Sequence, residues 1–188
     1  TYLGALQAFS AYQPNVVCIP MDDDGMRTDL LAEELKRLGP RGAKFIYTIP
    51  NFQNPAGVTL TPARRRELLE LAREYDIPVI EDDPYGRLRF EGGHALALRA
   101  LDDDVIYLGT FSKIFAPGLR LGWVIAPKPI LAKFLLAKQA ADLCGSAYAQ
   151  VTAERYFADT RWRKTLQTLT SAYAERRDAM IAALEEFF

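Results

Sequence analysis

The chain has 188 residues, with 23 lysines and arginines against 24 aspartates and glutamates, and its net charge of -1 favours neither nucleic acid nor an anionic membrane as a partner. Hydrophobic residues make up 49% of the chain, enough for one sizeable core or one domain plus part of another, and no apolar run is long enough to cross a bilayer. Cys18 and Cys144 lie far apart and form no metal or redox spacing, which is typical of reduced thiols in a cytoplasmic protein.

The first half of the chain predicts alternating strands and helices. Residues 16–20 (VVCIP) form a short apolar run that predicts a strand, and Thr28 or Asp29 is expected to cap the helix that follows. Residues 44–49 (KFIYTI) are rich in β-forming side chains and predict a buried strand.

A second helix is predicted to begin at Thr61 and Pro62, because threonine is a good N-cap and proline suits the first helical position. Its leucines are expected to face the core, and Arg64, Arg65 and Arg66 are expected to face outward. Because the net charge is close to zero, a solvated helix face is favoured over a basic binding patch.

The second half continues the alternation and then becomes helical. Strands that alternate with helices indicate βαβ units, hence an α/β fold with a mainly parallel sheet and helices on both faces. His94, the single histidine, lies in the glycine-rich stretch EGGHALA and is expected at the surface. The predicted strands are residues 77–80, 105–108 and 121–126, and the predicted helices are residues 131–143, 148–157 and 161–188.

The segment TFSKIFAPGLRLG, residues 110–122, is the most informative stretch. Packing explains poorly why a lysine, Lys113, stands shortly after the predicted buried strand 105–108. A lysine that forms a Schiff base explains it well, when Thr110 and Ser112 supply hydroxyls and Arg120 supplies a cation for a phosphate. This combination suggests pyridoxal phosphate (PLP), which carries one aldehyde and one phosphate.

Two upstream motifs also offer polar side chains. In EDDPYG, Asp82 lies just beyond the predicted strand 77–80, at the strand end where ligands of open α/β sheets bind. The acidic run 81–83 could instead suggest a metal site, but no histidine or further acidic cluster completes the ligands, and no metal is expected. Asn54 lies in NFQNPAG, which taken alone also fits an ordinary tight turn.

The three motifs IPNFQNPAG, PVIEDDPYGRLRF and TFSKIFAPGLRLG, in this order, resemble the central part of a fold-type I PLP enzyme of the class I/II aminotransferase group. Within that group the chain is most similar to the 2-aminoadipate, aromatic and branched-chain aminotransferases. The resemblance implies a three-layer α/β/α large domain over residues 1–160. Residues 161–188 would form an interdomain helix and the start of a small C-terminal domain that is mostly absent.

The resemblance also assigns roles to single residues. Lys113 would form the Schiff base and then move the substrate Cα proton, and partial burial beside cations would lower its pKa. Asp82, rather than Asp83, would hold the pyridine nitrogen protonated. The other implied cofactor contacts are Asn54 and Tyr85 to the phenolic oxygen, Thr110, Ser112 and Arg120 to the phosphate, and Tyr2 stacked on the ring.

The implied function is transfer of an amino group from an L-amino acid to a 2-oxo acid by a ping-pong mechanism, with Lys113, Asp82 and Tyr85 as catalytic residues. Two alternatives stay open: another fold-type I enzyme such as a β-lyase, and the PLP-binding effector domain of a MocR-type transcription regulator. The family also implies a cytoplasmic homodimer with its active site at the subunit interface. The ends of the chain are typical of a fragment, which we expect to bind PLP poorly by itself.

Overall fold

The computed structural model describes residues 2–187. The first residue of the first predicted domain, Thr1, and the last residue of the second, Phe188, lie outside the described residues. The described residues form two compact units. The first comprises residues up to 83 together with 95–109 and 123–134, and the second comprises residues 84–94, 110–122 and 135 onward.

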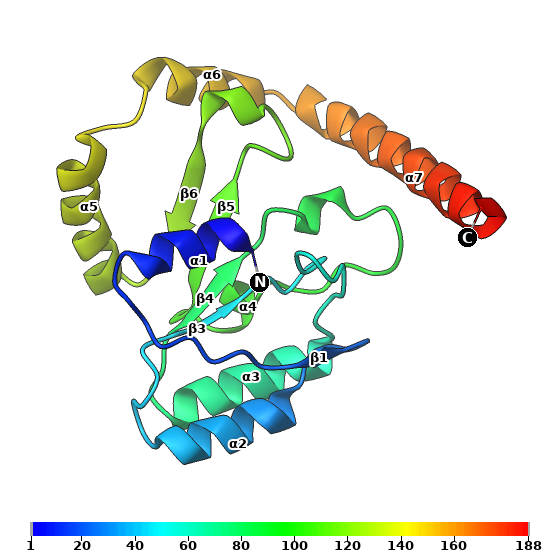
Figure 1. Ribbon diagram of the computed structural model, residues 1–188. Coiled ribbons are helices and arrows are strands. Elements are labelled where there is room, and N and C mark those ends of the chain that lie inside the picture. The colour runs from blue at the N-terminus through cyan, green and yellow to red at the C-terminus, as the bar shows by residue number, and fades with distance from the viewer. Residues whose placement is uncertain (1, 188) are drawn as a thin grey trace. The chain divides into compact units, whose positions relative to one another are not determined.

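A four-stranded sheet in the order β3-β4-β5-β6 lies mainly in the first unit (Figure 1). The pairs β3–β4 and β4–β5 are parallel, with Ile46 opposite Val79 and Ile80 opposite Ile106. The prediction of an α/β fold with a mainly parallel sheet is therefore confirmed. The strands are β3 (Ile46–Thr48), β4 (Val79–Asp82), β5 (Ile106–Thr110) and β6 (Gly122–Ile125).

The core of the first unit forms where the amphipathic helices α2 (Thr28–Leu38) and α3 (Pro62–Glu74), which lie side by side in Figure 1, bury their apolar faces. Burial of this apolar area is the main favourable contribution to the stability of the unit. The short helices α1 (Leu3–Ser10) and α4 (Leu98–Leu101) complete the unit. Core side chains include Leu31, Leu35, Ile46, Leu68, Leu69, Val79, Leu98 and Val105.

The predicted helix start at Thr61 is confirmed: its side chain accepts a hydrogen bond from the Arg64 amide, and Pro62 occupies the first turn. The capping prediction for the preceding helix is wrong. Thr28 is the first residue of α2, and the N-cap position is Arg27, whose side chain makes no capping hydrogen bond. Thr28 is buried and donates its hydroxyl hydrogen to Glu67 of α3 instead, which joins the two helices.

Two further predictions in this region are wrong. Residues 16–20 form no strand, and Val16 and Val17 are exposed. Strand pairing begins only after this run, in the two-residue ladder of β1 (Met21–Asp22) with β2 (Gly25–Met26). Arg65 does not face solvent with its neighbours. Its side chain is 1% exposed, because backbone carbonyls distant in the sequence satisfy the guanidinium inside the unit.

The second unit is built around helices α6 (Ala147–Ala158) and α7 (Arg161–Phe187), which match the predicted helices within a few residues. The 3-10 turn η1 (Gly86–Leu88) lies against α7, and there Arg177 pairs with Glu91 through two hydrogen bonds of 2.7 and 2.8 Å. The 3-10 turn η2 (Pro117–Leu119) also belongs to the second unit, and the helix α5 (Lys128–Asp142) is divided between the two units after residue 134. His94 is exposed, as predicted. Between residues 2 and 187, no helix combines the length and the apolar character needed to cross a membrane.

Candidate functional site

Asp82 is the last residue of β4, at the carboxyl edge of the sheet in the first unit. The hydroxyl of Tyr47 in β3 donates to Asp82 Oδ2 at 2.5 Å. Burial raises the pKa of the Asp82 carboxyl above its ordinary value, and the hydrogen bond from Tyr47 opposes that rise. Sequence reasoning missed Tyr47, because only the pairing of β3 with β4 brings its hydroxyl to this carboxylate.

Glu81, the preceding residue, has a different task. Its side chain is fully buried, and its two carboxylate oxygens accept hydrogen bonds of 2.9 Å from the backbone amides of Leu98 and Arg99. Glu81 thus satisfies the amides at the start of α4, which would otherwise lack partners. Within residues 2–187, no group of three histidine, cysteine, aspartate or glutamate side chains is placed to hold a metal ion.

Asp83 is held from two sides. The Asn51 amide donates to Asp83 Oδ1 at 2.9 Å, and the Tyr107 hydroxyl donates to Oδ2 at 3.2 Å. Asn51 in turn accepts a hydrogen bond of 2.8 Å from the guanidinium of the buried Arg65. Asp82 and Asp83 are therefore ordered by separate sets of partners within the same unit.

Asn54 lies in the loop that follows β3. The loop is closed on itself: the Gln53 amide donates to the Val58 carbonyl at 2.8 Å, and the Gln53 side chain donates to the Asn54 carbonyl at 2.8 Å. Gly57 adopts a positive φ of 73°, a conformation that favours glycine. Because β3 and β4 are parallel neighbours, their carboxyl ends meet at one edge, and this loop and Asp82 belong to the same edge.

The lysine segment lies in the second unit. Thr110 ends β5, and its hydroxyl oxygen accepts a hydrogen bond of 3.1 Å from the Ser112 amide. Lys113 lies in the following turn and is exposed, whereas partial burial was expected, because the chain leaves the strand at this point. Arg120 is also exposed, in a left-handed conformation with φ of 53°, and its guanidinium donates to the Pro117 carbonyl at 3.1 Å.

An aromatic cluster that the sequence did not reveal supports this lysine segment. Phe111 and Phe115, on either side of Lys113, pack on α6. The ring of Phe115 stacks on Tyr156 with centroids 4.0 Å apart, and Phe111 contacts Phe157 at 5.0 Å. The turn that presents Lys113 is therefore anchored at both ends by aromatic contacts.

The two predicted tyrosines belong to different units. Tyr85, in the second unit, precedes η1, and its carbonyl accepts a hydrogen bond from the Leu88 amide at 2.8 Å. Tyr2, in the first unit, precedes α1 and is 46% exposed. The predicted set thus divides into Tyr2, Asn54 and Asp82 in the first unit and Tyr85, Thr110, Ser112, Lys113 and Arg120 in the second.

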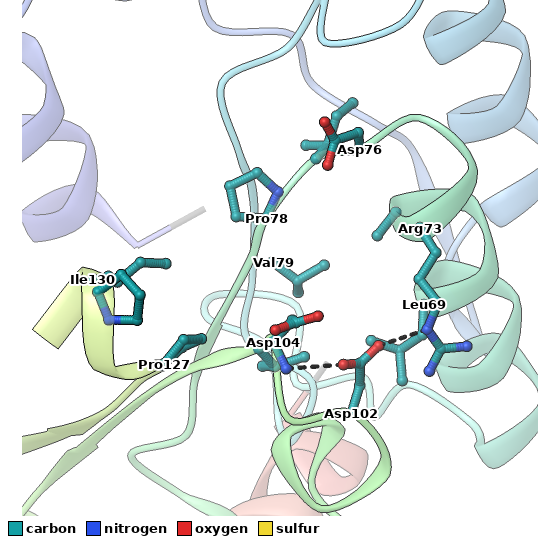
Figure 2. A pocket seen from close by; sticks show the side chains of 13 residues that line it. Leu69, Arg73, Asp76, Pro78, Val79, Asp102, Asp104, Pro127 and Ile130 are labelled. Carbon is teal, nitrogen blue, oxygen red and sulfur yellow. Dashed lines mark hydrogen bonds and ion pairs between the residues drawn. The ribbon is translucent and has the colours of Figure 1, made fainter.

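A cavity of about 390 Å³ lies elsewhere in the first unit (Figure 2). Pro78 and Val79 at the start of β4 line it, together with Asp104, which precedes β5, and the ion pair between Arg73 and Asp102. It is therefore at the amino ends of these strands, whereas Asp82 is at a carboxyl end. None of the predicted site residues lines it.

Taken by their chemistry, the side chains of the first unit offer a half-buried carboxylate and an amide, and those of the second offer an amine, hydroxyls and a guanidinium. A primary amine can act as a nucleophile or move a proton. A guanidinium beside hydroxyls suits a phosphate, and a carboxylate suits a protonated ring nitrogen.

Comparison with known proteins gives this set a context. The chain is 50% identical, over 191 residues, to aromatic-amino-acid aminotransferase 1 of Thermococcus litoralis, and the match covers 100% of this chain and 46% of that relative. The chain is also similar to the crystal structure of kynurenine aminotransferase from Pyrococcus horikoshii, with 51% sequence identity and a TM-score of 0.96. This match covers 100% of the present chain and 48% of the Pyrococcus chain.

A relative of another kind is an HTH-type transcriptional regulator of Bacillus subtilis, 34% identical over 100% of this chain and 38% of its own length. The chain spans about half the length, or less, of these relatives. The family model described as aminotransferase class I and II matches residues 1–187. The chain therefore belongs to the class I and II aminotransferase family.

Proposed function

We propose that the protein containing this chain is a PLP-dependent aminotransferase that moves an amino group from an L-amino acid to a 2-oxo acid by a ping-pong mechanism. The observation that carries the proposal is Asp82, a half-buried carboxylate at the carboxyl edge of a parallel sheet and held there by Tyr47, in a chain of this family. The donor set fits PLP, because each polar group of the cofactor has a chemically matched side chain.

When bound, PLP supplies an aldehyde that condenses with amines and a ring that withdraws electrons from the substrate. In this proposal Asp82 would keep the ring nitrogen protonated. The hydrogen bond from the Tyr47 hydroxyl fixes Oδ2 of Asp82 and thereby orients the carboxylate. The Lys113 Nζ atom would hold the aldehyde, and the same amine would move the proton of the substrate Cα atom. The exposed turn gives this amine room to take both roles.

The remaining residues are proposed to orient the cofactor. Asn54 and Tyr85 donate hydrogen bonds to the phenolic oxygen and favour its anion. Tyr2 supplies a flat ring for stacking, and its exposure leaves a ring face available. The phosphate contacts are Thr110, Ser112 and Arg120, which combine two hydroxyls with a guanidinium.

The wider assignments are part of the same proposal. Residues 1–160 belong to the PLP-binding large domain, and residues 161–188 begin the connection to a small domain. The complete protein is a cytoplasmic homodimer with the active site at the subunit interface. Aromatic amino acids and kynurenine are the donors to test first, because the relatives named for them are 50% and 51% identical.

A second candidate is the PLP-binding effector domain of a transcription regulator, favoured by the 34% identity to the HTH-type regulator. Such a domain would hold PLP on Lys113 and would not turn over a donor and an acceptor. The identities favour the enzyme, because the chain is 50% and 51% identical to the two aminotransferases and 34% identical to the regulator.

The test uses the intact protein with PLP, followed by visible absorbance before and after borohydride and by peptide mapping. We expect a visible band that disappears on reduction and a mass tag on Lys113. A second sample of the protein with PLP, not treated with borohydride, is then mixed with aromatic amino acids and 2-oxo acids. Amino transfer supports the aminotransferase, a tag without transfer supports the regulator, and elimination products support a β-lyase-like enzyme. No band, or a tag on another residue, would overturn the proposal.

A further inference from the structure

Arg65 closes the loop that carries Asn54. Its Nε atom donates to the Leu60 carbonyl at 2.9 Å, and its Nη2 atom donates to the Pro50 carbonyl at 3.0 Å. These carbonyls stand at the two ends of the loop, and the Leu60 amide also donates to the Pro50 carbonyl at 2.8 Å. The guanidinium therefore ties together the points where the loop leaves and rejoins the rest of the first unit.

The same guanidinium reaches the acidic end of β4. Nη2 of Arg65 donates to Asn51 Oδ1 at 2.8 Å, and Asn51 Nδ2 donates to Asp83 Oδ1 at 2.9 Å. Asp83 directly follows Asp82, the proposed cofactor carboxylate. A continuous chain of hydrogen bonds thus runs from α3 to the carboxyl edge of the sheet, within one unit.

We propose that Arg65 is a positioning residue for the cofactor site. It fixes Asn54 relative to Asp82, because it clamps both ends of the loop that carries Asn54 and orders Asp83 through Asn51. The inference rests on the proposed function, since Asn54 and Asp82 matter in this way only if they bind PLP. Arg65 touches neither the cofactor nor the substrate in this account. It acts through Asn51 and the carbonyls of Pro50 and Leu60.

Arginine suits this place for a chemical reason. Its planar guanidinium carries five donors in a fixed geometry, and here they meet four acceptors, including the Leu96 carbonyl at 3.0 Å. A lysine ammonium has three donors and cannot reach this spread of acceptors in one plane. Because the site is 1% exposed, water cannot replace a lost partner without disturbing the loop.

The experiment compares Arg65→Lys with Arg66→Lys in the full-length protein. Arg66 is the next residue of the same helix and is exposed, so its variant carries the same change of side chain without touching the clamp. Hydrogen exchange of amides 52–59 reports on the loop. The PLP dissociation constant and the pH midpoint of the visible band of bound PLP report on the site.

For Arg65→Lys we expect faster exchange of amides 52–59 than for Arg66→Lys, and a PLP dissociation constant about tenfold higher. The pH midpoint of the visible band should rise, because a displaced Asn54 no longer favours the phenolic anion. A general loss of stability would not by itself move that midpoint. Asn51→Ala cuts the link to Asp83 and keeps the arginine, and it should also raise the PLP dissociation constant. It is the variant to measure if Arg65→Lys does not fold.

Unchanged exchange of the loop, or unchanged affinity and midpoint with normal PLP binding by the parent protein, would overturn the inference and leave the proposed function standing. If the parent protein binds no PLP, the proposed function fails. The site role of Arg65 then fails with it, and the exchange data still decide whether the clamp exists.

Discussion

Tyr47 and Asp82 meet across two parallel strands, and the register of the sheet explains why. Tyr47 is opposite Ile80, and Asp82 lies two residues beyond Ile80 on the same face of β4. The Tyr47 hydroxyl extends along that face to Asp82 Oδ2, at 2.5 Å. The proposed partner of the cofactor nitrogen is thus oriented by a strand residue, not by a loop.

Tyr47→Phe should weaken PLP binding about three- to tenfold, because the hydrogen bond from Tyr47 holds the pKa of Asp82 down against the rise caused by burial. Without it, the pKa of Asp82 rises further and less of the carboxylate is charged at a given pH. The loss of affinity should therefore shrink as the pH increases. PLP titrations across a pH series measure this.

Tyr12→Phe is the matched control, since Tyr12 is 88% exposed. Equal PLP affinity and equal pH dependence in the Tyr47 and Tyr12 variants would contradict the assigned role of Tyr47.

Lys113→Ala should abolish the borohydride tag and lower amino transfer by about 10²–10⁴-fold, the usual contribution of a general acid/base. Because Lys113 is exposed, the free energy of unfolding should change by less than about 0.5 kcal/mol. Kinetic assays and denaturant unfolding give the two values. Lys133→Ala, another exposed lysine change, should keep the tag, and a tag that persists in Lys113→Ala would refute the assignment.

Gly109→Ala should destabilise the protein by about 1–3 kcal/mol, as overpacking usually does. A Cβ atom at Gly109 would lie 2.2 Å from the ring of Trp123, so the indole must move. Gly118→Ala is the control, because nothing lies within 4 Å of a Cβ atom at that position. Urea unfolding of both variants checks this, and equal stabilities would show that Trp123 yields without cost.

Below about pH 4.5, Glu81→Gln should destabilise the protein by about 1–3 kcal/mol, because the glutamine NH2 group would face one of the two backbone amides that donate to a carboxyl oxygen of Glu81. Burial raises the pKa of Glu81 above its ordinary value of 4.5, so its proton is bound more tightly in the native state than in the unfolded state. This contribution to stability is complete below about pH 4.5 and is lost as the pH rises through the raised native pKa.

Parent and Glu81→Gln stabilities should therefore converge as the pH rises through that window, as measured by urea unfolding at several pH values. The control is Glu70→Gln, the same change of side chain at an exposed position of α3. A gap between parent and Glu81→Gln that widens with pH would contradict the sign worked out here.

Several features could be read from local patterns. The N-cap at Thr61, the apolar runs that became β3 to β6, and the acidic end of β4 all depend on neighbouring residues, so short stretches of sequence suffice to predict them. The failed strand at residues 16–20 shows the limit of such patterns. An apolar run becomes a strand only where another strand offers its hydrogen bonds, and here none does so.

The sequence by itself determined the alternation of strands and helices, the family motifs and the residue types of the candidate site. Only the tertiary structure decided that Arg65 lies inside while Arg66 lies outside, that Tyr47 holds Asp82, and that Glu81 closes the start of α4. The physical reason is that a buried polar group is stable only where partners satisfy it. Those partners are 5 to 35 residues away in sequence, so sheet register and loop closure bring them together.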